Sequence, residues 1–337
     1  MLEALAASTD SRLRAIGLST QLVTARLRGH REILNLGMPG AVPTGRKRRT
    51  IYDAKEGSSL PGTLVRSEGQ ADGADTTVNE AYEYSGVTYD FYHDVLERNS
   101  VDDRGMRLDS SVHYREDPSE EYDNAYWDGR QMVYGDGDGV CFDRFTKCVD
   151  VIGHELTHGV TQFEANLEYH SQAGALNESI SDVFGTLVKQ WHFGQTVDNA
   201  DWLIGAGLFM PSVRGKALRS MKEPGTAYDD PRLGRDPQPG HMKDLVHLPD
   251  SARGDWGGVH INSGIPNRAF YLSASALGGH AWEKAGKIWY QALCARLRPH
   301  SAFKKAADAT ISVAQELFGT AERAAVQAGW KQVGVLG

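Results

Sequence analysis

The sequence predicts an α+β protein with a β-rich N-terminal half and a mainly helical C-terminal half. Between residues 51 and 114, short segments are separated by glycine, serine and aspartate, which is typical of strands joined by turns. One helix is expected within this half, because apolar and small residues recur at helical spacing from Val78 to Leu96. In the second half, apolar residues recur at helical spacing between 303 and 317 and form one face of a predicted helix. Ser301 is the expected N-cap, and Gly319 is expected to end the helix.

The centre of the chain carries His154-Glu155-Leu156-Thr157-His158, an H-E-x-x-H motif. On a helix, positions i and i+4 lie on one face, so His154 and His158 can bind one Zn²⁺ through two imidazoles. Glu155 lies beside that stripe, where it can face the open coordination position without being a ligand. It is the candidate general base for a water activated by zinc.

A second predicted helix supplies the remaining parts of a hydrolytic zinc centre. Its segment Asn177-Glu178-Ser179-Ile180-Ser181-Asp182 places Glu178 and Asp182 four residues apart, so both side chains point the same way. Glu178 is the candidate third ligand. Asp182 is the candidate acceptor for the other ring N–H of His154, which fixes the tautomer of that imidazole. A bare H-E-x-x-H motif can arise by chance, but this second segment is independent evidence for zinc.

With these motifs, the sequence from about Ile51 to the C-terminus resembles the thermolysin family of zinc endopeptidases. Nineteen residues separate His158 from Glu178, which is the spacing of that family. The zinc aminopeptidases with a similar motif have a shorter spacing and a G-A-M-E-N segment that this sequence lacks. The resemblance implies two lobes that flank a cleft: residues 49–165, β-rich and including the zinc helix, and residues 166–337, mainly helical.

The resemblance also implies which groups stabilise the oxyanion of the reaction. Tyr169 lies where the family has a tyrosine with this role. The segment from Asp255 to Gly264, D-W-G-G-V-H-I-N-S-G, resembles the family's D-x-G-G-V-H-x-N-S-G block. In that block His260 would donate to the tetrahedral intermediate and Asp255 would orient it. Arg219 matches an arginine that holds a substrate carbonyl.

Substrate binding can be predicted from the same resemblance. Asn124, Ala125 and Trp127, in the segment N-A-Y-W, match an edge strand that binds extended peptide by main-chain hydrogen bonds. The positions that match the apolar lining of the specificity pocket are Phe142, Phe145, Val151, Ile204, Leu208 and Leu218. We therefore expect cleavage on the amino side of leucine, phenylalanine or similar residues. An ordinary core role is the alternative for any one of these side chains.

The family's double calcium site is not expected here. Asp150 and Asp201 match two of its carboxylates. The other matching positions hold Lys189, Leu203, Ala206 and Gly207. A calcium site needs several oxygen ligands, so we expect the ammonium of Lys189 to replace the metal and to pair with both aspartates. A lysine that points to water is the alternative. The glycine-aspartate run at 134–139 looks calcium-like, but we interpret it as a turn.

Residues 1–48 are expected to form a prosegment. Leu13, Ile16 and nearby arginines indicate an amphipathic helix that continues to residue 23 and is broken near Gly17. A glycine- and proline-rich stretch then leads into Arg46-Lys47-Arg48-Arg49. A prosegment this short resembles the protealysin-like branch of the family, which implies autoprocessing between about Thr44 and Ile51. The alternative is a permanent extension.

Charge and composition limit the possible partners. Residues 1–50 hold nine lysines and arginines against three acidic residues, whereas the whole chain has a net charge of −8. This basic N-terminal segment is expected to dock onto the acidic remainder of the same chain, which makes a nucleic-acid role improbable. No apolar run is long enough to span a membrane. The three cysteines are expected to be reduced thiols, and a monomer is the default.

The export route and two rival functions are left open by the sequence. The resemblance favours secretion, but no secretory signal is visible in the first residues, so a cytoplasmic protein is the alternative. One rival is a catalytically silent zinc protein that binds peptides by its edge strand. Another is a different zinc hydrolase, such as an aminopeptidase.

Overall fold

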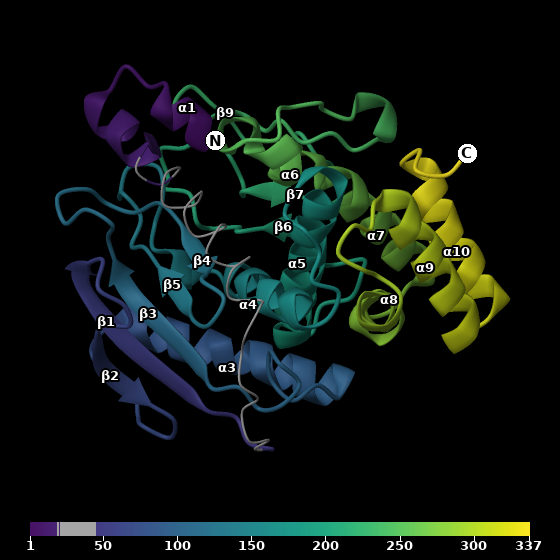
Figure 1. Ribbon diagram of the computed structural model, residues 1–337, viewed down its shortest axis with the longest axis horizontal. Helices are drawn as coiled ribbons and strands as arrows, with labels where there is room; N and C mark the ends of the chain where they lie inside the picture. Colours follow the sequence, from purple (N-terminus) through teal and green to yellow (C-terminus); the bar gives the residue numbers. More distant parts are fainter. Residues whose placement is uncertain (19, 21–44) are drawn as a thin grey trace.

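The computed structural model describes residues 1–18, 20 and 45–337 (Figure 1). It has the predicted α+β architecture, with a mixed sheet in the N-terminal lobe and helices in the C-terminal lobe. Two central helices, α4 (Val149–Phe163) and α5 (Ser171–His192), lie between them. Among the described residues, no helix is both long and apolar enough to cross a membrane.

The described part of the N-terminal lobe contains a five-stranded sheet in the order β2-β1-β3-β5-β4. Its strands are β1 (Arg49–Gly57), β2 (Thr63–Ser67), β3 (Leu108–Tyr114), β4 (Ala125–Trp127) and β5 (Met132–Tyr134). Strands β1, β3 and β5 run parallel, whereas β2 and β4 pair antiparallel with their neighbours. The segment predicted to bind peptide is therefore an edge strand, β4, of this sheet.

Helix α3 (Thr76–Leu96) is the predicted helix of the N-terminal lobe and packs beside the sheet. Its first turn is capped by Asp75, whose carboxylate accepts hydrogen bonds from the N–H groups of Thr77 and Val78. His113, at the end of β3, binds Asp75 and also Asp136 in the 134–139 run. Asp138 of that run accepts from three following backbone N–H groups, so the run is a turn, as expected.

The two central helices approach each other closely because glycines face each other at the crossing. A Cβ on Gly153 would lie 3.1 Å from the Cα of Gly185, and a Cβ on Gly185 would lie 2.4 Å from the carbonyl oxygen of Asp150. Any larger residue would push the helices apart. This contact brings His154 on α4 beside Asp182 on α5.

The C-terminal lobe packs its helices around buried tryptophans, including Trp289 and Trp330. Its helices are α6 (Asp255–Asn262), α7 (Gly264–Leu277), α8 (Lys287–Ala295), α9 (Phe303–Leu317) and α10 (Thr320–Gln332). Short strands connect it to α5: β6 (Leu203–Ile204), β7 (Arg219–Ser220), β8 (Asp229–Asp230) and β9 (Gly234–Arg235). The predicted cap of α9 is wrong by one residue. Ala302 is the N-cap, and the Ser301 hydroxyl instead accepts from the N–H of Arg298.

The N-terminal segment packs against the N-terminal lobe. Helix α1 (Leu2–Ala6) is followed by helical residues 11–18, with Leu13 and Ile16 buried as an amphipathic helix requires. No break occurs at Gly17 itself, because residues 11–18 are all helical. Its missing side chain allows close packing, because a Cβ there would lie 2.4 Å from the backbone nitrogen of Ala6. The predicted continuation to residue 23 lies outside the described residues.

Candidate active site

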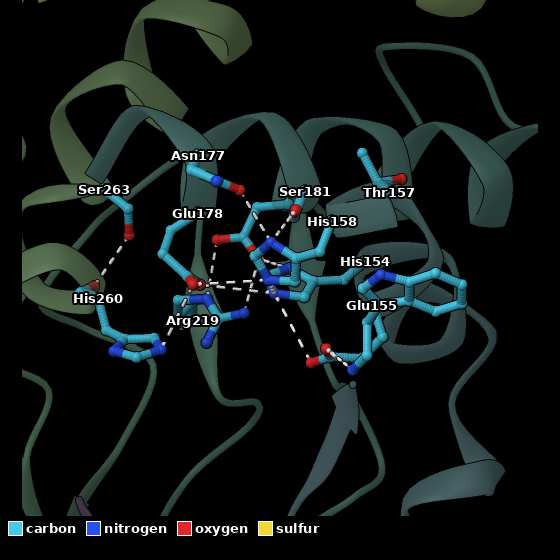
Figure 2. Close-up of polar contacts among 12 residues, drawn as sticks. His154, Glu155, Thr157, His158, Asn177, Glu178, Ser181, Arg219, His260 and Ser263 are labelled. Atoms are coloured by element: carbon cyan, nitrogen blue, oxygen red, sulfur yellow. Dashed lines mark hydrogen bonds and ion pairs between the residues drawn. The ribbon is translucent and has the colours of Figure 1, made fainter. Parts of the chain in front are cut away.

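Helices α4 and α5 bring three candidate zinc ligands together, as Figure 2 shows. The donor atoms of His154, His158 and Glu178 all lie within 4.8 Å of one another, and the three side chains are buried. The Nε2 atoms of the two histidines are 3.1 Å apart. Each is 3.5 Å from an oxygen of the Glu178 carboxylate.

The hydrogen bonds behind the histidines indicate that this donor set fits a metal cation. Nδ1 of His154 donates to Asp182 (2.8 Å), and Nδ1 of His158 donates to the side-chain oxygen of Asn177 (2.9 Å). In neutral imidazoles, these bonds leave the Nε2 lone pairs facing each other and the Glu178 carboxylate. Such an arrangement is favourable only around a positive charge, and its ligand types suit zinc.

The pKa shifts of the buried groups also indicate a pocket that favours a positive charge. Burial opposes the charged form of His154, but hydrogen bonds to Asp182 and Glu178 outweigh it and raise its pKa to about 10. Burial also opposes the charged form of Asp182, but Arg219 and His154 lower its pKa to about 2. The pKa of Glu178 is lowered as well, despite burial, by the neighbouring histidines. The pocket therefore stabilises positive charge strongly.

Asp182 is more than an orienting group for His154. Arg219, on β7, donates two hydrogen bonds to its carboxylate, from Nε (2.8 Å) and from one terminal nitrogen (2.6 Å). Asn267, on α7, donates a third at 2.8 Å. Three elements thus converge on one buried carboxylate that fixes a zinc ligand.

Sequence reasoning assigned no role to the residues that orient His158 or to Asn267. Asn177 and Ser181 are four residues apart on α5, and the Ser181 hydroxyl lies 3.1 Å from Nδ1 of His158. That i, i+4 spacing beside Glu178 was a signal that could have found them. Asn267 lies 85 residues from Asp182, and no local pattern predicts that contact.

Glu155 faces the zinc pocket from the side of the edge strand. One carboxylate oxygen accepts the backbone N–H of Trp127 at 3.1 Å, and the other lies 3.9 Å from Nε2 of His154. The Trp127 ring is fixed to the same helix, because its indole N–H donates to Gln162 at 3.0 Å. Glu155 is therefore close to the metal pocket without belonging to the ligand set, as a general base requires.

The predicted oxyanion groups lie on the opposite side of the pocket. The Tyr169 hydroxyl donates a short hydrogen bond to Glu178 and lies 3.1 Å from Nε2 of His260. Asp255 binds His260 twice: one oxygen lies 2.6 Å from Nδ1, and the other accepts the backbone N–H at 2.8 Å. This fixes the His260 ring with Nε2 towards the zinc pocket.

A cleft of about 470 Å³ connects these groups. Eight predicted substrate-binding residues line it: Asn124, Ala125, Phe142, Phe145, Val151, Ile204, Leu218 and Arg219. Leu208 is fully buried in the same core cluster as Phe142, Phe145 and Val151, and its role in the pocket stays a prediction. Trp127 contributes its backbone to Glu155 while its ring is buried. Met1 and Ala4 of the N-terminal segment also line the cleft.

At the matched calcium position, the structure places the ammonium of Lys189. Its Nζ donates to Asp150 and to Asp201, both at 2.9 Å, and to the carbonyl oxygen of Leu203 at 2.5 Å. The buried carboxylate of Asp150 also accepts the N–H of Gly205 at 3.1 Å. The alternative of a solvent-facing lysine is therefore wrong. Cys141, Cys148 and Cys294 are free thiols, as expected.

Two lobes around an H-E-x-x-H helix, with a glutamate from the next helix completing the ligand set, define a zinc metalloendopeptidase. Residues 43–162 match the thermolysin metallopeptidase catalytic domain, and residues 165–335 match the alpha-helical domain of the same family. The chain therefore belongs to the thermolysin family of metallopeptidases, as the sequence motifs indicated.

Individual relatives agree with this assignment. The chain is 55% identical over 295 residues to an extracellular metalloprotease of Pectobacterium carotovorum subsp. carotovorum, covering 87% of this chain and 83% of that protein. It is 53% identical over 288 residues to the protease PrtS of a Photorhabdus strain, covering 85% and 76%. Its fold matches the precursor of protealysin from Serratia proteamaculans, with a TM-score of 0.89, 50% identity and coverage of 99% and 97%.

Proposed function

We propose that this metalloendopeptidase cleaves peptide bonds on the amino side of bulky hydrophobic residues and is made as a zymogen. The observation that carries the proposal is the buried set of His154, His158 and Glu178 beside Glu155, at the floor of an apolar cleft. The side chains of Phe142, Val151 and other predicted pocket residues supply that apolar wall. A leucine or phenylalanine side chain bound there would leave water, which favours such substrates.

Each polar group then has a chemical role. His154, His158 and Glu178 would hold the zinc ion, which would supply Lewis-acid activation of the scissile carbonyl and of the attacking water. Glu155 accepts the proton of that water and passes it to the leaving amine. His260 and Tyr169 donate to the developing oxyanion from the opposite side, and Asp255 keeps His260 oriented.

The substrate backbone is expected to lie along β4. This strand is the edge of the sheet in the described chain, so an extended peptide can add to it by main-chain hydrogen bonds. Asn124 precedes the strand and lines the cleft, while the N–H of Trp127 binds Glu155. The strand therefore links the position of the substrate to the position of the general base. Arg219 lines the cleft as well, and we propose that its guanidinium also holds a substrate carbonyl.

A blocked peptide tests this function directly. We expect the mature enzyme to cleave an internally quenched peptide with both ends blocked before leucine or phenylalanine, and a zinc chelator to stop cleavage. A matched peptide with aspartate at that position should be cleaved at least tenfold more slowly, because a charge would lose its hydration in the apolar pocket. Equal rates for both peptides would contradict the pocket assignment, and cleavage only of an unblocked peptide would indicate an aminopeptidase.

The N-terminal segment is proposed to keep the precursor inactive. Met1 and Ala4 line the cleft, and Ala4 packs against Gly234 of β9. Leu5 and Leu13 are buried in the core cluster of the N-terminal lobe. The guanidinium of Arg12 lies 2.8 Å from the carboxylate of Glu121, in the segment that precedes the edge strand β4. A peptide bound across these surfaces would compete with substrate.

The maturation window predicted between Thr44 and Ile51 can be narrowed. Arg49 begins β1, and its guanidinium lies 3.7 Å above the ring of Tyr82. Lys47 is already fixed to Asp90 at 2.6 Å. Ile51, whose side chain would suit the specificity pocket, is buried and paired with strands on both sides. We therefore propose that processing occurs before Lys47, where the chain is exposed.

Incubation of the purified precursor tests this boundary. We expect a stable product that begins at or before Lys47, identified by intact mass and N-terminal sequencing, with activity rising as it accumulates. The Glu155→Gln precursor should not process itself but should be cut by added mature enzyme. A precursor that is fully active while its mass never changes would show that the segment is a permanent extension. A product beginning at Thr50 or Ile51 would contradict the boundary.

We also propose that Lys189 replaces calcium in this protein. Its ammonium occupies the space between Asp150 and Asp201, where a divalent ion would meet too few oxygen ligands. The same ammonium donates to the carbonyl oxygen of Leu203, the first residue of β6. The second residue of this strand, Ile204, lines the cleft. The lysine thereby joins the zinc helix to the substrate pocket without a metal.

A further inference from the structure

An aromatic contact beside the zinc pocket joins the two segments that carry the proposed oxyanion donors, and Trp256, one of its two partners, also lines the cleft. The rings of His170 and Trp256 pack edge to face, with centroids 5.4 Å apart and planes at 90°. His170 directly follows Tyr169, and Trp256 lies in the turn that leads to His260. One contact therefore connects the backbone of both donors.

The backbone of this turn is strained at Trp256. Its φ and ψ are 51° and 46°, and its neighbours Asp255 and Gly257 have φ values of 50° and 82°. A bulky side chain rarely adopts this left-handed conformation, which costs free energy except at glycine. The surrounding contacts must hold it, and such strain is concentrated at functional sites.

Contacts on both sides of the aromatic pair supply that restraint. The N–H of Trp256 donates to the carbonyl of Ser251 at 2.9 Å. On the other side, Nδ1 of His170 lies 2.7 Å from a carboxylate oxygen of Asp250. Gly257 lies directly against Ser171, since a Cβ there would be 2.8 Å from the serine hydroxyl oxygen. The turn and the start of α5 are thus fastened together.

The indole ring acts through packing and not through its polar atom. Nε1 of Trp256 is buried and has no hydrogen-bond partner among the residues that the structure describes. A phenyl ring could therefore fill much of the same space without losing a hydrogen bond. Removal of the ring would release both the turn and His170.

We propose that Trp256 is a positioning residue for oxyanion stabilisation. The packing of its ring against His170, which we call the clasp, sets the distance between the two donors. That distance is 3.1 Å, from the Tyr169 hydroxyl to Nε2 of His260. The proposal rests on the proposed roles of Tyr169 and His260. Because those donors must match the transition state, a small displacement should reduce turnover more than substrate binding.

Three variants of the mature enzyme test the clasp, with kcat and KM measured on a blocked hydrophobic peptide. Trp256→Gly removes the ring and accepts the left-handed backbone, so the variant can still fold. Its kcat should fall roughly tenfold to a hundredfold while KM changes by less than about threefold. Trp256→Phe should recover most of the loss. Trp282→Ala, which removes another tryptophan–histidine contact (a stack on His280 with centroids 4.3 Å apart) outside the cleft lining, is the control.

A second test measures the affinity for a peptide inhibitor that carries a tetrahedral phosphorus group. Its affinity should fall in parallel with kcat/KM in Trp256→Gly, whereas the affinity of a cleavage-product peptide should not change. The clasp is overturned if Trp256→Gly keeps kcat within twofold, if Trp256→Phe loses as much as Trp256→Gly, or if only KM changes. Tyr169→Phe and His260→Ala measured alongside separate the two ideas. If both retain kcat, the proposed oxyanion roles fail, and the clasp fails with them.

Discussion

Replacement of Glu155 by glutamine should abolish peptide hydrolysis while the protein keeps its zinc. Glutamine has nearly the same size as glutamate. Its amide oxygen can still accept the hydrogen bond that the Trp127 N–H donates to the carboxylate in the wild type, at 3.1 Å. The amide cannot accept a proton, so the general-base contribution is lost, which is at least about a thousandfold in kcat. Zinc should remain bound because Glu155 lies outside the ligand set.

Three measurements on this variant separate chemistry from folding. Zinc content by atomic spectroscopy and the melting temperature should match those of the wild type, whereas kcat should fall below about a thousandth. Glu322→Gln is the control, since Glu322 pairs with Lys284 on the remote surface of the helical lobe. Peptide cleavage by Glu155→Gln at a wild-type rate would refute the mechanism. Absence of hydrolysis by the mature wild type itself would favour a silent peptide-binding protein.

Replacement of Lys189 by methionine should produce the largest loss of stability outside the zinc site. The lysine is almost fully buried, and Asp150 is 2% exposed, so the change leaves a buried carboxylate without its cation. Breaking one partner of such a pair costs about 3 to 5 kcal/mol in the free energy of unfolding. Lys304→Met, which breaks an exposed pair with Asp308, should cost less than about 1 kcal/mol.

The pH and calcium dependence of stability test the same ammonium. Burial opposes the charged form of Lys189, but Asp150 and Asp201 outweigh it and raise its pKa. A raised pKa in the folded state means that this stabilisation is complete at neutral pH and is lost as pH rises through that pKa. A calcium-selective chelator should not change the melting temperature of the wild type, whereas calcium should stabilise Lys189→Glu. An ordered calcium ion bound between Asp150 and Asp201 in the wild type would refute the replacement.

Several parts of the site could be predicted because they depend on local spacing. His154 and His158 share a helical face by periodicity alone, and so do Glu178 and Asp182. The edge position of β4 followed from the N-A-Y-W segment and the family resemblance. The approach of α4 to α5 was not local: it depends on Gly153 and Gly185, whose close contact is visible only in three dimensions.

Errors arose where packing outweighs a local signal. Glycine at position 17 predicts a nearby helix break, but residues 11–18 are helical, and the missing side chain lets α1 pack against that position. Ser301 is a good capping residue by type, yet its hydroxyl binds Arg298 in the preceding turn.

Motif spacing was enough to predict the zinc ligands, a candidate general base and the family, because positions on a helix specify which side chains can act together. The contacts that hold these groups in place are visible only in three dimensions. The fold places Asn267 on Asp182, Lys189 between two aspartates, and Met1 in the cleft wall. The physical reason is that such contacts join residues far apart in the chain, and their distances are set by how helices and strands pack.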